Sequence, residues 1–130
     1  MVIDTSAVMA VLLGEPQRAA LESLLVSGPC RMSAVTRVEL AMVTEGRAGA
    51  EGARIADEFL ERFDVDVRSV DALIARSAIN AWRRFGKGRH PAGLNFGDCF
   101  SYALAIELGE PLLFVGGDFS KTDVDPALTI

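Results

Sequence analysis

The feature that most constrains the fold is the alternation of very short apolar runs with longer amphipathic stretches. The short runs fall at residues 2–3, 30–33, 65–67 and 112–115, and between them hydrophobic residues recur at helical spacing. Short apolar strands that alternate with helices form parallel sheets covered on both faces. The sequence therefore predicts an α/β fold, a three-layer α/β/α sandwich with a short-stranded, mainly parallel central sheet.

Glycine and proline set the limits of the predicted helices. Gly14 and Pro16 end a first helix over residues 5–13, and residues 48–50 break the next long amphipathic stretch. Residues 86–94 contain three glycines and a proline and are predicted to form a loop. The other helices are predicted at residues 17–26, 34–47, 51–63, 70–85 and 96–108.

Length and composition indicate one globular unit. The 130 residues suit a single domain over residues 1–130. No run approaches the ~18 apolar residues of a membrane span, and the first apolar run has an acid at position four and no basic segment before it. We therefore expect no membrane association and a cytoplasmic location. Cys30 and Cys99 are expected to be reduced, inert core residues.

The counts of histidine and cysteine exclude several kinds of catalytic site. His90 is the sole histidine, which excludes paired-histidine ribonuclease chemistry and the HExxH metalloprotease motif. Two cysteines cannot form a four-cysteine zinc site. The net charge of −5 at pH 7 also means that the surface as a whole is not that of a basic nucleic-acid-binding protein.

Four acidic residues stand where ligands of α/β proteins bind. Asp4 ends the first predicted strand, Asp118 follows the last one, and Asp98 opens a helix that is otherwise poor in charge. Glu39 lies on the apolar side of its helix, near Val35 and Met42. The carboxyl ends of parallel strands meet at one edge of the sheet, so these acids would crowd into one cleft. Such a cluster is unstable without a counter-cation.

The chemistry of the cluster favours a hard divalent ion. Carboxylates and water suit Mg²⁺, with Mn²⁺ as an alternative, and the chain has no cysteine and histidine set for zinc. Such an ion commonly completes its shell with phosphate oxygens of the substrate. Metal-assisted hydrolysis of a phosphodiester bond is the reaction that this arrangement predicts.

Polar and basic residues near the acids are candidates for substrate binding. Thr5 and Ser6 place hydroxyls beside Asp4, at the start of a helix whose backbone amides attract anions. Lys87 and Arg89 belong to a basic segment just upstream of Asp98. We expect this segment to contact the phosphates of a nucleic acid.

Each acid also has a structural interpretation. Asp4 suits a helix N-cap, and Asp118 suits a turn. Glu39 and Asp98 each stand three residues after a Thr or an Asn, which is the spacing of a capping box. A non-catalytic binding module in which all four acids are caps therefore stays open.

A phosphatase or phosphotransferase that attacks through an aspartate is a further alternative. The strand-terminal Asp4 suits that chemistry. It also requires a second acid just after the first and a lysine before the later acids. Ser6 takes the place of that second acid, and the last predicted strand offers no lysine.

Three segments together resemble a known family. MVIDTSAVMAVL, TRVELAMV and GLNFGDCFSYALAIELGEPLLFVGGDF occur in this order and are similar to the PIN-domain endoribonucleases, specifically the VapC-type toxins of bacterial toxin–antitoxin pairs. The resemblance implies a PIN fold and a metal-dependent ribonuclease. It implies that Asp4 and Asp98 bind the metal, that Glu39 is a further catalytic acid, and that Thr5 or Ser6 is the hydroxyl residue after the first aspartate.

The fourth acid departs from the commoner PIN pattern. That pattern ends the last strand with Thr and places Asp two residues later, whereas this chain has Phe114 and Gly116 there and an acid at Asp118. The resemblance leaves Asp118 either a metal-supporting catalytic acid or a structural residue. It also implies an RNA substrate, a homodimer, and a VapB-type antitoxin that covers the site and contacts the early helices.

Overall fold

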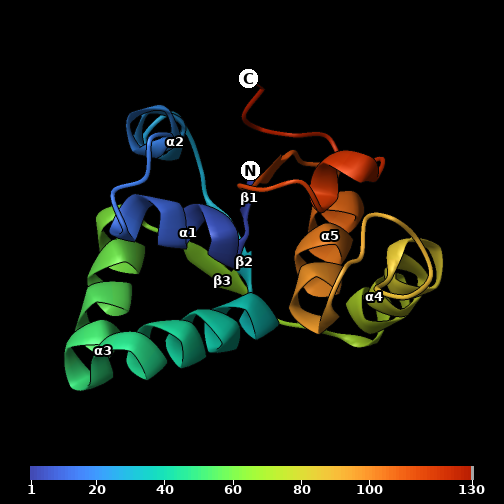
Figure 1. Cartoon of the computed structure of the whole chain (residues 1–130), viewed down its shortest axis with the longest axis horizontal. Helices are drawn as coiled ribbons and strands as arrows, with labels where there is room; N and C mark the ends of the chain where they lie inside the picture. The colour runs from blue at the N-terminus through green and yellow to red at the C-terminus, as the bar shows by residue number, and fades with distance from the viewer. Residues whose placement is uncertain (130) are drawn as a thin grey trace.

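A parallel sheet of four short strands lies at the centre of the molecule (Figure 1). The computed structural model describes residues 1–129. All neighbouring strands pair in parallel, in the order β3-β2-β1-β4. The predicted α/β class with a parallel sheet is confirmed. The strands are β1 (Val2–Ile3), β2 (Arg31–Ser33), β3 (Asp66–Arg68) and β4 (Leu112–Leu113).

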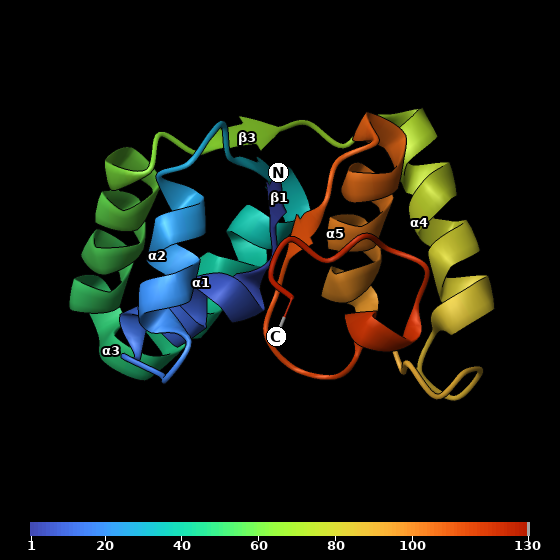
Figure 2. The same cartoon turned by 90° about the horizontal axis from the view of Figure 1, so that it is seen from above.

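Helices cover both faces of this sheet and complete the three predicted layers (Figure 2). One layer contains α1 (Thr5–Leu12), α2 (Arg18–Leu25) and α3 (Ala34–Arg62). The other contains α4 (Ala72–Phe85) and α5 (Phe96–Leu108), and the short 3-10 helix η1 (Phe119–Lys121) follows β4. No helix within residues 1–129 is long and apolar enough to cross a membrane.

Strands β1 and β4 are apolar throughout because both of their faces are buried. Val2 and Leu112 pack into the core beside α4 and α5. Their neighbours Ile3 and Leu113 pack into the second core, beside α1, α2 and α3. Successive side chains of a strand point to opposite faces, so two-residue strands contribute to both cores. Cys30 and Cys99 are buried in these cores, as predicted.

The predicted break at residues 48–50 is a sharp bend inside α3. Gly49 has φ 59° and ψ −140°, while the chain on either side is helical. A residue with a Cβ rarely adopts this conformation. Beyond the bend the second part of the helix runs in a different direction, as Figure 1 shows. Ala56 and Phe59 thereby reach the core beside α1.

Two local predictions need correction. The last strand was expected over residues 112–115, but β4 ends at Leu113 and the Val115 N–H donates a 3.1 Å hydrogen bond to the Ser6 hydroxyl. The side of α3 that carries Met42 was expected to face a core. Instead Leu40 is fully buried, whereas Met42 is 71% exposed.

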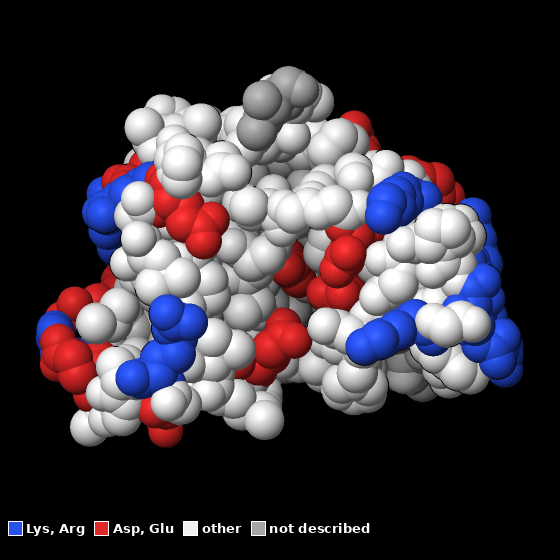
Figure 3. All heavy atoms as spheres, viewed as in Figure 1, with Lys and Arg blue, Asp and Glu red and all other residues white. Residues whose placement is uncertain are grey.

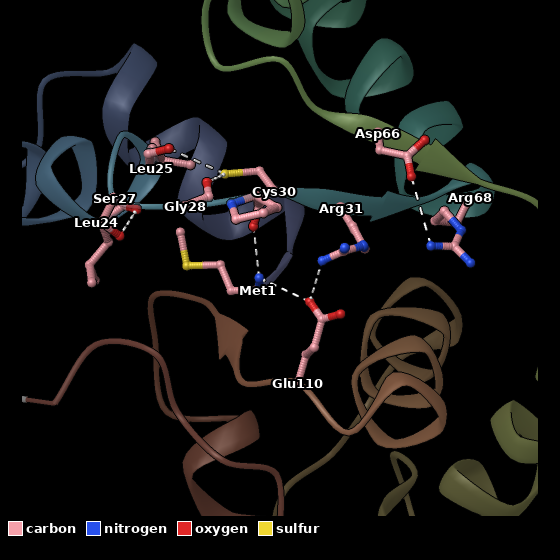
Figure 4. Close-up of polar contacts among 11 residues, drawn as sticks. Met1, Leu24, Leu25, Ser27, Gly28, Cys30, Arg31, Asp66, Arg68 and Glu110 are labelled. Atoms are coloured by element: carbon pink, nitrogen blue, oxygen red, sulfur yellow. Dashed lines mark hydrogen bonds and ion pairs between the residues drawn. The ribbon is translucent and has the colours of Figure 1, made fainter.

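Ion pairs and hydrogen bonds connect the segments at the amino ends of the strands (Figure 4). The amino group of Met1 lies 3.0 Å from the Glu110 carboxylate and donates to the Pro29 carbonyl. Arg31, at the start of β2, contacts the same carboxylate at 2.9 Å. At this edge of the sheet, negative charge is therefore paired with positive charge.

Candidate active site

The candidate site lies at the opposite edge, where the strands end. The chain leaves β1 to form β2 on one side of it and later forms β4 on its other side. Ligands of α/β proteins bind at such a change in strand order, beyond the carboxyl ends of the strands. Asp4 directly follows β1, and Asp118 follows β4.

Asp4 is buried and held by donors from two elements. It is the N-cap of α1, and its Oδ2 accepts a 3.0 Å hydrogen bond from the Ser6 N–H. Its Oδ1 accepts a 2.6 Å hydrogen bond from the Ser101 hydroxyl of α5. Only 3% of the residue is exposed. The capping interpretation of Asp4 is therefore confirmed, and the same contacts orient its carboxylate.

Glu39 does not cap a helix. The N-cap of α3 is Ser33, so the capping-box interpretation of Glu39 is wrong. Its Oε1 accepts a 2.6 Å hydrogen bond from the Thr5 hydroxyl, next to Asp4. Its carboxylate also lies against Gly97, where a Cβ would stand 2.2 Å from Oε2. Glu39 is thereby placed between the start of α1 and the start of α5.

Asp98 both caps its helix and faces the other acids. It forms the predicted capping box with Asn95, which uses Oδ2 of its carboxylate. Burial raises the pKa of Asp98 to about 7. The hydrogen bond from the Asn95 N–H lowers this pKa, whereas the charges of Asp4, Glu39 and Asp118 raise it further. Burial, and then the charge of Asp4, also raises the pKa of Glu39. Neighbouring carboxylates thus lie close enough to disfavour the ionisation of Asp98 and Glu39.

Asp118 is the fourth acid, and it is exposed. It precedes η1 but makes no side-chain capping hydrogen bond. Since Glu39 and Asp118 are not caps, the interpretation of all four acids as caps is wrong. The structure instead brings Asp4, Glu39 and Asp118 close enough for their charges to act on the carboxyl of Asp98.

Within the described part of the chain, the four acids have no basic side chain paired with them. Among residues 1–129, the ion pairs involve other acids and none of these four. Figure 3 shows Asp and Glu side chains gathered in the hollow at the middle of this face. This contrasts with Glu110 at the other edge, which has two positive partners.

The donor set fits a hard divalent cation. All four groups offer carboxylate oxygens, which Mg²⁺ and Mn²⁺ prefer. Within the described part of the chain, no group of three or more acidic, histidine or cysteine side chains is arranged to hold a metal ion. Mg²⁺ is commonly held by only one or two carboxylates and keeps several waters. An open carboxylate cleft is compatible with that mode of binding.

The basic segment lies on α4 and the loop that follows it. The Arg89 guanidinium stands over the Trp82 ring, 4.0 Å from its centroid. Lys87 lines a groove between α4 and α5. Arg84 has a structural role instead, because it pairs with Asp123 at 3.3 Å. Figure 3 shows Lys and Arg side chains along the edge of the face over α4, beside the acidic hollow.

The sequence analysis missed three residues beside the acids. Gly97 lies against the Glu39 carboxylate, Ser101 donates to Asp4, and Thr36 contacts Ser101. Thr36 stands one turn before Glu39, and Ser101 one turn after Asp98. Both are fully buried polar residues. Their helical spacing from an acid was the available signal, because residues three apart share a helix face.

Fold and site together define a small α/β/α protein with a carboxylate cleft at the change in strand order. The PIN-domain family model matches residues 1–125. Ribonuclease VapC of Mycolicibacterium smegmatis is 52% identical over 125 residues, which are 95% of this chain and 97% of that protein. Ribonuclease VapC42 of Mycobacterium tuberculosis is 46% identical over 131 residues, covering 99% of this chain and 100% of the relative.

A solved structure shares the fold. VapC20 of Mycobacterium tuberculosis, described as a sarcin–ricin loop cleaving toxin, superposes with a TM-score of 0.72 at 24% identity, over 96% of this chain and 98% of that one. The chain belongs to the PIN-domain family, within its VapC group.

Proposed function

We propose that this chain is a metal-dependent endoribonuclease that acts as the toxin of a toxin–antitoxin pair. The observation that supports the proposal is that the charges of Asp4, Glu39 and Asp118, which come from separate segments, act on Asp98. Within residues 1–129, none of these four acids forms an ion pair with a basic side chain. The names of the relatives, which are ribonucleases, support RNA as the substrate.

The acids have distinct proposed roles. Asp4 and Asp98 hold Mg²⁺ or Mn²⁺, because both are buried and each is fixed by hydrogen bonds to part of its carboxylate. Glu39 and Asp118 complete the catalytic set from the sides of the cleft. When bound, the ion would lower the pKa of a coordinated water and so supply hydroxide for hydrolysis of the phosphodiester.

The hydroxyl and basic residues position the RNA. The Ser6 hydroxyl accepts from Val115 and keeps its own proton for a phosphate oxygen. The Thr5 proton is committed to Glu39, so Thr5 acts on substrate through that acid. Lys87 and Arg89, both exposed, contact phosphates beside the cleft.

Cleavage of RNA by the purified protein tests the proposal. We expect activity with Mg²⁺, none with EDTA, and at least a hundredfold loss in Asp98→Asn with the fold intact. Asp66→Asn is the matched control, because Asp66 is an exposed acid on β3. Full activity in EDTA, or in Asp98→Asn, would refute the mechanism.

A VapB-type antitoxin is the proposed protein partner. A groove between α1, α2 and the second half of α3 is lined by apolar and basic side chains, namely Val11, Leu12, Phe59, Arg18 and Arg62. An apolar segment of the antitoxin can pack there. A basic side chain of the antitoxin entering the acidic cleft would neutralise the charge that a metal otherwise neutralises.

A second copy of the chain is the proposed partner of another face. Phe96, Met42 and Val38 are 75%, 71% and 58% exposed. Phe96 borders two grooves of 640 and 750 Å³, one lined by Lys87 and the other by Glu39. Such large apolar side chains offer up to about 150–250 Å² each, and monomers rarely expose patches of more than a few hundred Å². Twofold pairing about Phe96 would bring the acidic edge of one copy to the basic edge of the other.

Sedimentation velocity tests this homodimer. We expect a dimer for the unmodified protein and a monomer for Phe96→Asp. Ile106→Asp is the control, because Ile106 is also exposed on α5 but lies outside both grooves. A protein that is monomeric at every concentration, or a dimer that survives Phe96→Asp, would exclude this interface.

A further inference from the structure

We infer that Thr36 and Ser101 form a directed hydroxyl relay that positions Asp4 for metal binding. The inference rests on the proposed function in one respect, since it takes Asp4 to be a metal ligand. Neither residue touches the open cleft, because both are fully buried. They are therefore positioning residues.

Two hydrogen bonds between buried side chains connect three elements. The Ser101 hydroxyl of α5 lies 2.6 Å from Asp4 Oδ1 at the end of β1. The Thr36 hydroxyl of α3 lies 3.1 Å from the Ser101 hydroxyl. Buried hydroxyls require partners, and these two find theirs in each other and in Asp4.

The chemistry of the groups fixes the direction of the relay. An ionised carboxylate only accepts hydrogen bonds, and a serine hydroxyl has a single proton. The Ser101 proton is therefore committed to Asp4. It follows that Thr36 is the donor in its contact with Ser101, and the relay runs from Thr36 through Ser101 to Asp4.

The relay belongs to a set of hydrogen bonds that connect the segments carrying the acids. Thr36 lies three residues before Glu39, and Ser101 lies three residues after Asp98. On the other side, Thr5 follows Asp4 and donates to Glu39. The segments that carry Asp4, Glu39 and Asp98 thus each supply a hydroxyl that contacts another of the three. Loss of one hydroxyl would loosen a carboxylate that a different segment carries.

The expected effect is on metal affinity. Asp4 accepts one internal hydrogen bond on each oxygen, which fixes the plane of its carboxylate while leaving lone pairs for an ion. Loss of a partner that orients a metal ligand typically weakens binding roughly 10- to 100-fold. Ser101→Ala should therefore weaken Mn²⁺ binding within that range, even in the absence of RNA.

The test measures free Mn²⁺ by electron paramagnetic resonance in titrations of the metal-free protein. Thr36→Val should weaken Mn²⁺ binding less than Ser101→Ala, because it removes only the group that orients Ser101. Thr44→Val is the matched control: Thr44 is a buried threonine of the same helix whose hydroxyl donates to the Leu40 carbonyl. Thermal unfolding in EDTA shows whether each variant folds. If Ser101→Ala does not fold, the Mn²⁺ affinity of Thr36→Val tests the relay.

The double variant distinguishes a relay from two separate contributions. If Thr36 acts through Ser101, the double variant should bind Mn²⁺ no more weakly than Ser101→Ala alone. Ser101→Thr, which retains the hydroxyl, should recover much of the affinity.

The outcomes that overturn the relay are distinct from failure of the proposed function. Unchanged Mn²⁺ affinity in folded Ser101→Ala and Thr36→Val, or a loss in Thr44→Val of the same size as in Thr36→Val, would overturn the relay alone. An unmodified protein that binds no Mn²⁺ would overturn the proposed function and the relay with it.

Discussion

At the scale of single residues, Gly97 sets how closely Glu39 approaches the start of α5. A Cβ at this position would meet the Glu39 carboxylate, the far end of a flexible side chain, at 2.2 Å. Gly97→Ala should therefore displace that carboxylate and leave the fold intact. Displacements of about 1 Å in an active site can lower rates roughly a hundredfold, so we expect RNA cleavage to fall at least tenfold.

Gly28→Ala is the control for this prediction, because no atom lies within 4 Å of a Cβ added there. Thermal unfolding separates a local effect from a global one. Full activity in Gly97→Ala would show that the position of Glu39 is unimportant for catalysis.

The buried carboxyl of Asp98 predicts a pH-dependent stability in the absence of metal. Its pKa is about 7 in the folded protein, against 3.8 for the free group. Between these values the folded state holds a proton that the unfolded state releases, so stability falls as pH rises through this window. Urea unfolding in EDTA should show this fall from about pH 4 to about pH 7, with a smaller fall in Asp98→Asn. Equal slopes in the two proteins would contradict the assigned pKa.

The acids could be predicted from sequence because strand ends and helix starts are local features. Asp4 and Asp98 stand at such points. The partners of the acids could not be predicted in the same way. Ser101 and Asp4 are 97 residues apart in the chain, and only the packing of α5 against β1 brings them together.

At the scale of secondary-structure elements, the bend of α3 depends on Gly49. Its φ of 59° and ψ of −140° suit glycine alone. We expect Gly49→Ala to destabilise the protein by about 1–3 kcal/mol, measured by urea unfolding. Gly46→Ala, three residues earlier in the same helix and with open space around its Cβ, should instead be neutral or stabilise by up to about 1 kcal/mol. Similar values for both variants would show that the bend does not require glycine.

Periodicity predicted most elements but not the environment of every face. The helices begin near the predicted positions because local capping residues such as Asp71 and Asn95 define their starts. The side of α3 that carries Met42 was predicted to face a core, yet Met42 is exposed. An apolar stripe indicates that a face is suited to packing. It does not distinguish the chain's own core from a surface for a partner.

At the scale of the whole molecule, charge is divided between the two edges of the sheet. At the amino edge, Glu110 forms ion pairs with Met1 and Arg31. At the carboxyl edge, the acids instead accept hydrogen bonds from hydroxyls and backbone amides. Metal binding should therefore stabilise the folded protein, by about 2.7 kcal/mol when the ion is at a hundred times its dissociation constant. Thermal unfolding with and without Mn²⁺ measures this gain, which Asp4→Asn should abolish. An equal gain in Asp4→Asn would place the ion elsewhere.

The most direct test is anomalous diffraction from crystals of the protein soaked in Mn²⁺. A single segment cannot supply this cleft, since Asp4 and Asp98 come from opposite ends of the chain. We predict an anomalous peak between the carboxylates of these two residues, at ordinary metal–oxygen distances or one water removed. A saturating soak that leaves this position empty while both side chains remain in place would contradict the account.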